Sequence, residues 1–203
     1  MTTIKRATPA KQAARGPISL KITLRTIKPP IWRRILVPRG MTLGDLHMAI
    51  QVVMGWGNGH LHAFEVGGQQ YGEPGIMEDD HVASEARLTL SSMIKSGVNR
   101  FRYTYDFGDN WEHDILLEKR PPPTHATAVP ACIAGERNCP PEDCGGPWGY
   151  AEVLEILGNP DHPDHEEQRE WIGEDFDPEA FSVSAADAAL GEVFRRKSTP
   201  HAG

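Results

Sequence analysis

The stretch Ile18-Ser-Leu-Lys-Ile-Thr-Leu24 alternates apolar and polar residues, and this period of two predicts a half-buried strand. The segment Ile31-Trp-Arg-Arg-Ile-Leu-Val37 predicts a second strand, and the short connection between the two favours an antiparallel hairpin. A helix is expected to begin at Thr42, because Thr42 and Asp45 fit a capping box. A third strand, His60–Val66, follows. This order of strand, strand, helix and strand is typical of a β-grasp, or ubiquitin-like, core.

A second hairpin is the clearest one in the chain. Phe101–Phe107 and Trp111–Leu117 both alternate, and Gly108-Asp109-Asn110 between them is typical of a tight turn. Helical spacing and capping signals predict later helices over Trp148–Leu157, over Asp161–Ile172 and from Ser184 onward. Because strands come first and helices last, the predicted class is α+β. The expected fold is a β-grasp-like core with an added antiparallel hairpin and C-terminal helices.

Charge divides the chain into an arm and an acidic body. Residues 1–17 carry four basic side chains and no acidic one, which predicts a disordered basic arm. Residues 18–182 are then the main domain, and residues 183–203 a C-terminal helix and tail. Beyond the arm, 17 basic side chains face 28 acidic ones, and the formal net charge of the whole chain is -7. Nucleic-acid binding by the whole surface is therefore disfavoured.

Segments of export-signal or membrane-helix length are not evident in the sequence. No apolar run follows the basic arm, and no stretch approaches the roughly 20 apolar residues that a membrane helix needs. We therefore expect a cytoplasmic protein without a membrane partner, in which cysteines stay reduced.

All three cysteines fall within the stretch Cys132–Tyr150, which is rich in proline and glycine and is expected to be neither helix nor strand. Cys132, Cys139 and Cys144 could hold zinc if a histidine such as His113 completed the tetrahedron; His125, His162 and His165 are the other candidates. The gaps of six and four residues are not those of a zinc knuckle. Reduced thiols partly buried under Trp148 are the favoured alternative, and a redox pair is a third.

Three histidines suggest a second candidate site. His60 and His62 lie two residues apart on a predicted strand and so share a face, and His113 lies on the apolar face of its own strand. If these strands are neighbours, the three imidazoles could meet in a metal or acid–base site. The candidate pocket consists of His60, His62, Asp106, Asp109, Trp111 and Trp148. The alternative is that each histidine is satisfied within the core and the aspartates cap a turn.

Arg33 and Arg34 follow a tryptophan and a proline pair. Their guanidinium groups could contact an anion or a partner's carboxylate. The favoured alternative is a solvated strand face.

Seven strings in order carry a resemblance to a known family. They are Ile27–Arg34, Thr42–His47, Ile50-Gln51 with Met54-Gly-Trp56, His60-Leu-His62, Tyr105–His113, Cys132–Tyr150 and Gly173–Phe181. Together they resemble the plasmid pRiA4b ORF-3-like family, the TnpR-type passenger proteins of an insertion element, over about residues 18–182. The resemblance implies an association with plasmids and transposons and no established reaction. The residues do not indicate resolvase chemistry, because no serine-nucleophile motif precedes a basic helix-turn-helix.

The expected function is a cytoplasmic protein-interaction or accessory module with a protein partner, rather than an enzyme. One alternative is a metal-dependent enzyme that uses its histidines or cysteines, with zinc as a candidate cofactor and the cofactor otherwise left unassigned. A second alternative is a nucleic-acid accessory factor of mobile elements, which would use the basic arm with Arg33 and Arg34.

Overall fold

The computed structural model describes residues 16–73, 75, 81–119 and 129–198. Most of the predicted basic arm, the proline-rich segment at 120–128, the candidate ligand His125 and the tail from 199 lie outside these residues.

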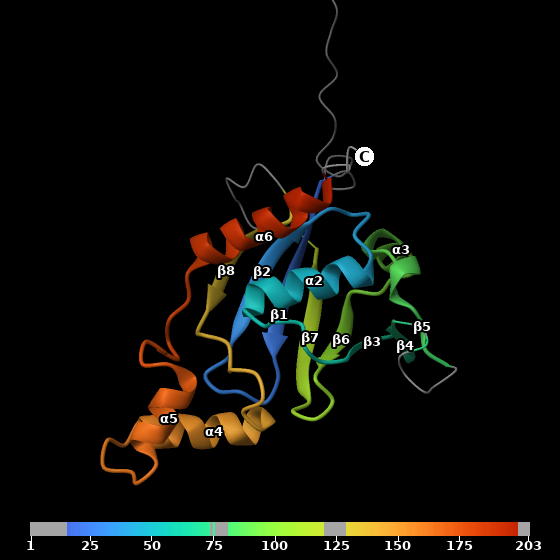
Figure 1. The fold of residues 1–203 in the computed structure, drawn as a ribbon. Coiled ribbons are helices and arrows are strands. Elements are labelled where there is room, and N and C mark those ends of the chain that lie inside the picture. The colour runs from blue at the N-terminus through green and yellow to red at the C-terminus, as the bar shows by residue number, and fades with distance from the viewer. Residues whose placement is uncertain (1–15, 74, 76–80, 120–128, 199–203) are drawn as a thin grey trace, which may run out of the picture.

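One eight-stranded sheet forms the body of the protein, with strand order β5-β4-β3-β6-β7-β1-β2-β8 (Figure 1). Neighbouring strands are antiparallel except for the short parallel pair β4 and β5. The strands are β1 Ile18–Leu24, β2 Trp32–Val37, β3 His62–Val66, β4 Gln69–Gly72, β5 Ala83–Ser84, β6 Arg100–Tyr105, β7 Trp111–Glu118 and β8 Ala131–Glu136.

Alternation along the strands decides which face of the sheet is buried. In β1, Leu20 and Ile22 are fully buried, whereas Lys21 between them is only half-buried. The neighbouring strand β7 shows the same alternation of burial, and its buried Ile115 pairs with Ile22. Side chains two apart on a strand point to the same face, so the apolar set of each strand lies on one side, where the helices pack.

The helical segments of the described residues are α2 Leu43–Met54, η1 Glu85–Arg87, α3 Leu90–Lys95, α4 Gly146–Leu157, α5 His165–Ile172 and α6 Val183–Ser198. Helix α2 crosses one face of the sheet, and α6 packs against α2 and the edge strand β8 (Figure 1). The Thr42 side chain caps α2 by accepting a hydrogen bond from the backbone N–H of Asp45. Helices α4 and α5 pack on each other beyond one end of the sheet (Figure 1). The described part of the chain contains no helix long and apolar enough to cross a membrane.

The predicted α+β class is confirmed, as are both predicted hairpins, β1–β2 and β6–β7. The order β1, β2, α2, β3 that suggested a β-grasp-like core is present along the chain. In the sheet, however, β6 and β7 lie between β1 and β3. The prediction that Cys132–Tyr150 is neither helix nor strand is wrong. Its first residues pair with β2 as the edge strand β8, and its last residues begin α4 at Gly146.

Candidate functional site

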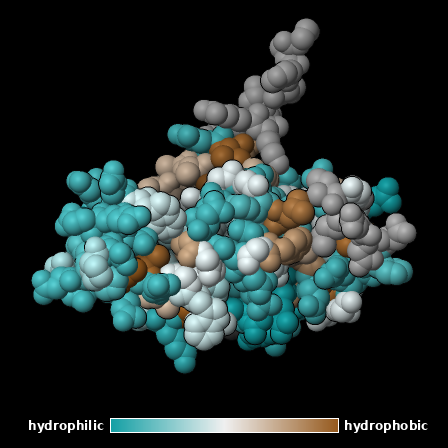
Figure 2. Space-filling model, turned by 60° about the horizontal axis from the view of Figure 1, so that its bottom comes forward, coloured by the Kyte–Doolittle hydropathy of each residue, from teal (hydrophilic) through white to brown (hydrophobic). Residues whose placement is uncertain are grey.

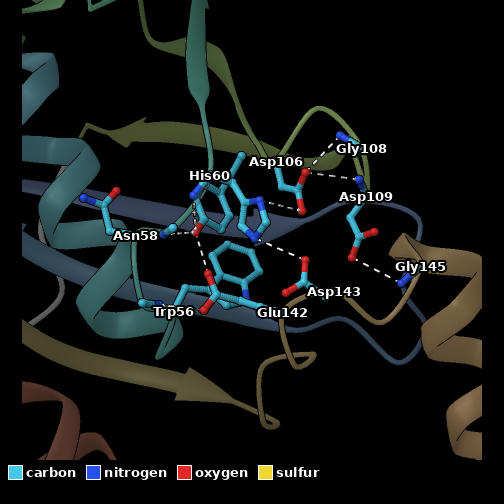
Figure 3. Close-up of polar contacts among 12 residues, drawn as sticks. Trp56, Asn58, His60, Asp106, Gly108, Asp109, Glu142, Asp143 and Gly145 are labelled. Carbon is cyan, nitrogen blue, oxygen red and sulfur yellow. Dashed lines mark hydrogen bonds and ion pairs between the residues drawn. The ribbon is translucent and has the colours of Figure 1, made fainter.

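Three side chains from separate segments converge at one end of the sheet (Figure 3). His60 Nδ1 lies 3.6 Å from Asp106 Oδ2, and His60 Nε2 lies 3.3 Å from Asp143 Oδ1. One donor atom from each residue lies within 4.8 Å of the other two, a spacing that could hold a metal ion. Within the residues that the structure describes, this is the only such group of three or more histidine, cysteine or acidic side chains. We call it the His–Asp–Asp cluster.

Asp106 is held by the turn between β6 and β7. Its Oδ1 accepts hydrogen bonds from the backbone N–H groups of Gly108, at 2.9 Å, and Asp109, at 3.4 Å. These bonds orient the carboxylate so that Oδ2 faces His60. The Asp106 side chain is only 11% exposed, while that of His60 is 31% exposed and that of Asp143 is 73% exposed. The cluster therefore has an interior side and an open side.

His60 is held by the loop between α2 and β3. The backbone N–H groups of Gly59 and His60 both donate to the Tyr105 hydroxyl, at 3.0 and 3.3 Å. That hydroxyl in turn donates to Glu142 Oε1 at 2.5 Å. Tyr105 thus connects the His60 loop to the segment that carries Asp143. Burial, followed by the bond to Glu142, raises the pKa of Tyr105 and keeps it a donor.

The segment 137–145, which we call the acidic loop, is fastened to the rest of the site at several points. Glu142 Oε2 accepts from the backbone N–H of Gly57 at 3.0 Å, and Trp56 Nε1 donates to Pro140 O at 3.1 Å. Gly145 N donates to Asp109 Oδ2 at 3.2 Å. These contacts position Asp143 over His60 from outside the sheet (Figure 3).

Several residues at this end of the sheet have a left-handed backbone conformation. Asn58 (φ 60°), Asp106 (φ 54°) and Asp143 (φ 60°) all adopt positive φ angles. Asparagine and aspartate tolerate this region better than other residues with a side chain, at some cost in energy. Strained backbone of this kind is concentrated at functional sites, where surrounding structure imposes it.

A hollow of about 500 Å³ opens beside the cluster, and His60 is part of its wall. His47, His62, Glu73 and Glu85 also line it. His62 Nε2 lies 2.8 Å from Glu85 Oε2, an arrangement in which a carboxylate fixes the orientation of an imidazole. The rings of His47 and His62 stack with centroids 3.5 Å apart and an interplanar angle of 3°.

The protonation of His47 follows from its neighbours. Gln51 Nε2 donates to the Tyr103 hydroxyl, so that hydroxyl donates in turn to His47 Nδ1, 2.8 Å away. His47 Nε2 then carries the proton and donates to Asn58 Oδ1 at 2.6 Å. Burial, and then the charge of His62, lower the pKa of His47 to about 4. His47 is therefore neutral, with both ring nitrogens engaged in hydrogen bonds.

His113 does not join the other two histidines. It is fully buried in the core, with its ring centroid 5.4 Å from that of Trp56 and 5.3 Å from that of Tyr103. Burial lowers the pKa of His113 to about 4, and the nearby backbone of Tyr103 and Trp111 acts in the opposite direction with a smaller effect. Trp111 is also fully buried. The expected meeting of His60, His62 and His113 is therefore wrong, although His60 and His62 do line one hollow.

The thiols are not brought together with His113 as a metal group among the described residues. Cys132 and Cys139 are buried and Cys144 is half-buried, and all three are free. Burial raises the pKa of Cys132 to about 11 and of Cys144 to about 12, and raises that of Cys139 further. The Trp148 side chain is 88% exposed, so the prediction that it covers them is wrong.

Arg33 and Arg34 are both occupied by internal contacts. Arg33 is buried, its Nε donates to Val53 O at 2.8 Å, and its guanidinium lies 3.8 Å from the centroid of the Phe181 ring. Arg34 forms an ion pair with Glu118 at 3.0 Å. The expectation of a solvated strand face is wrong for Arg33, because its side chain is buried against Val53 of α2 and the ring of Phe181. Its buried position also removes it as an anion contact.

Four residues of the site were not predicted from the sequence: His47, Glu85, Glu142 and Asp143. The run Pro140-Pro141-Glu142-Asp143 offered a signal, because two carboxylates follow a rigid proline pair beside Cys144. Glu85 offered no such signal.

Comparison with known proteins places the chain among relatives. The plasmid pRiA4b ORF-3-like protein family matches residues 17–185. The "Uncharacterized protein y4hQ" of Sinorhizobium fredii is 39% identical over 178 residues, which cover 87% of this chain and 91% of that protein. A crystal structure of MM3350, a protein of unknown function from Methanosarcina mazei Go1, superposes with a TM-score of 0.74 at 42% identity. The superposition covers 83% of this chain and 96% of the MM3350 chain.

Proposed function

The chain belongs to the plasmid pRiA4b ORF-3-like family, and from the geometry of its site we infer that it is a metal-dependent hydrolase. We propose that His60, Asp106 and Asp143 bind one divalent cation, with Zn²⁺ or Mn²⁺ favoured. The observation that carries this proposal is the convergence of the three donor groups at the edge of a hollow large enough for a small substrate.

The donor set suits these cations. One imidazole nitrogen and two carboxylate oxygens are ligands that zinc and manganese accept. Three protein ligands leave coordination positions for water, which is the arrangement of catalytic rather than structural zinc sites. The exposed side of the cluster, formed by Asp143, gives that water access to solvent.

The hollow supplies the remaining chemistry. A divalent cation held by His60, Asp106 and Asp143 would supply an activated water for attack on an ester carbonyl or phosphorus. The His62–Glu85 pair is suited to take the proton from that water and return it to the leaving oxygen. One water molecule is then consumed, its oxygen ends in the acid product, and its proton ends on the alcohol.

The structure bears differently on a nucleic-acid role and on a protein-interaction role. Of the basic residues that the nucleic-acid alternative would use, Arg33 is buried, Arg34 is paired with Glu118, and most of the arm lies outside the described residues. A protein-interaction role is favoured by the exposed indoles of Trp148 and Trp171 on the α4–α5 helix pair. That role is compatible with metal binding at the cluster.

Metal analysis and a hydrolysis assay test the proposal together. Protein purified without chelator should contain about one Zn²⁺ or Mn²⁺ per chain, and Asp143→Asn should lose it. Asp143 is the ligand to change because its exposed side chain has no role in the core. The metal-loaded protein should hydrolyse p-nitrophenyl acetate, p-nitrophenyl phosphate or bis-p-nitrophenyl phosphate, and the Asp143→Asn and His62→Gln variants should not.

Asp114→Asn is the matched control, since Asp114 is an exposed carboxylate on the far side of β7. It should keep both metal and activity. Metal-loaded protein that hydrolyses none of the three esters would contradict the catalytic part. Failure to bind any divalent cation would contradict the whole proposal.

A further inference from the structure

A groove runs between α4 and α5 and is also lined by Asp143 and Cys144 of the acidic loop. Its volume is about 470 Å³. Val153 and Ile156 of α4 and Trp171 of α5 supply apolar surface, and the Trp171 side chain is half exposed. An exposed tryptophan beside apolar side chains is the kind of surface that anchors protein partners.

Carboxylates dominate the polar part of the groove wall. Asp143, Glu152, Asp164 and Glu167 all line it, and the lining residues include neither lysine nor arginine. The side chain of Asp164 is 63% exposed and that of Asp143 is 73% exposed. At neutral pH such a wall attracts cations and repels acidic segments. In Figure 2, hydrophilic residues surround a small hydrophobic patch at the left of the face shown.

A second exposed indole lies on the same helix pair. Trp148, in the first turn of α4, is 88% exposed, a level that is unusual for so large an apolar side chain. The two tryptophans and the four carboxylates together present stacking surfaces beside negative charge. Arginine and lysine side chains satisfy both features, because their cationic heads pair with carboxylates and stack on indole rings.

We propose that this groove docks a short arginine- or lysine-bearing segment of a partner protein. Cationic side chains pair with Glu152 and Glu167, and a neighbouring aliphatic stem packs on Trp171. The docking does not depend on hydrolysis or on metal, because neither Glu152, Glu167 nor Trp171 belongs to the His–Asp–Asp cluster. Asp143 alone borders both sites.

Fluorescence anisotropy with a defined peptide tests the proposal. The probe is a fluorescein-labelled octapeptide in which four arginines alternate with four alanines, and its control carries neutral citrulline in place of arginine. The full-length chain should bind the arginine peptide at least tenfold more tightly than the citrulline peptide. The indole N–H signal of Trp171 in the NMR spectrum should shift as the peptide is added.

Paired substitutions separate docking from general attraction to an acidic protein. The Glu152→Gln/Glu167→Gln variant and Trp171→Ala should each weaken binding at least fivefold. The Glu155→Gln/Glu166→Gln variant loses the same net charge from exposed positions on the same helices, outside the groove wall. It should bind as the unchanged chain does.

Three outcomes would overturn the proposal. The first is equal weakening in both double variants, which would indicate nonspecific attraction. The second is no preference for the arginine peptide. The third is concentration-dependent self-association in sedimentation that Trp171→Ala abolishes, which would make a second copy of the chain the occupant. Metal content and ester hydrolysis should be unchanged in the Glu152→Gln/Glu167→Gln variant, so failure here is separate from failure of the hydrolase proposal.

Discussion

At the scale of single residues, the two buried histidines are the most informative. His47 and His113 are 5% and 0% exposed, and burial lowers the pKa of each to about 4. An unfolded histidine titrates near 6.5. Between pH 6.5 and about 4, these two histidines are therefore protonated in the unfolded chain but remain neutral in the folded chain.

This difference predicts how stability depends on pH. The folded state should be most stable above pH 6.5, and the free energy of unfolding should fall as the pH drops toward 4. Each histidine contributes roughly 1 kcal/mol per pH unit near pH 5. His113→Phe should reduce that slope by roughly 1 kcal/mol per pH unit, because it removes a group whose pKa is lowered by burial. Urea unfolding at pH 5, 6 and 7 measures the slope, and an unchanged slope in this variant would contradict the assignment.

At the scale of elements, the acidic loop depends on close backbone contact. A Cβ atom added at Gly146 would lie 2.2 Å from Asp109 O, and Gly146 has a φ of 69°. Only glycine fits there without displacing either the loop or the β6–β7 turn. The first residue of α4 thus allows the end of the acidic loop to lie directly against the β6–β7 turn.

Gly146→Ala should therefore loosen the loop. We expect the free energy of unfolding to fall by about 1–3 kcal/mol and the affinity for a divalent cation to fall at least tenfold. Gly59→Ala is the matched control, because a Cβ there meets nothing within 4 Å and its N–H bond to Tyr105 is kept. Calorimetric titration with Zn²⁺ and urea unfolding of both variants provide the measurements. Equal metal affinity in the two variants would show that loop position does not control the site.

Strand prediction succeeded where local pattern is strong. The alternation of β1, β6 and β7 is visible in the sequence because one face of each strand is buried and the other is not. Strand β8 was missed, since Cys132-Ile-Ala-Gly-Glu136 has little alternation and its pairing with β2 supplies the order. Strand β4 was missed because Gln69-Gln70-Tyr71 is short and polar, and β3 provides its partner.

At the scale of the whole molecule, the site is a product of long-range contact. His60, Asp106 and Asp143 are brought together because the α2–β3 loop, the β6–β7 turn and the acidic loop meet at one end of the sheet (Figure 3). Local sequence pattern carries no information about such a meeting. It identified His60 and Asp106 as candidates and pointed to the segment 132–150. In that segment the sequence pattern pointed to the thiols, which are largely buried, instead of Asp143, whose carboxylate lies next to His60.

The central claim is that one divalent cation binds between His60, Asp106 and Asp143. Crystals grown with one equivalent of Zn²⁺ test it most directly, through anomalous difference density measured at the zinc absorption edge. We predict a single strong peak within about 2.0–2.2 Å of one donor atom from each of the three residues. No peak at that position, or a peak at Cys132, Cys139 or Cys144 instead, would contradict the claim.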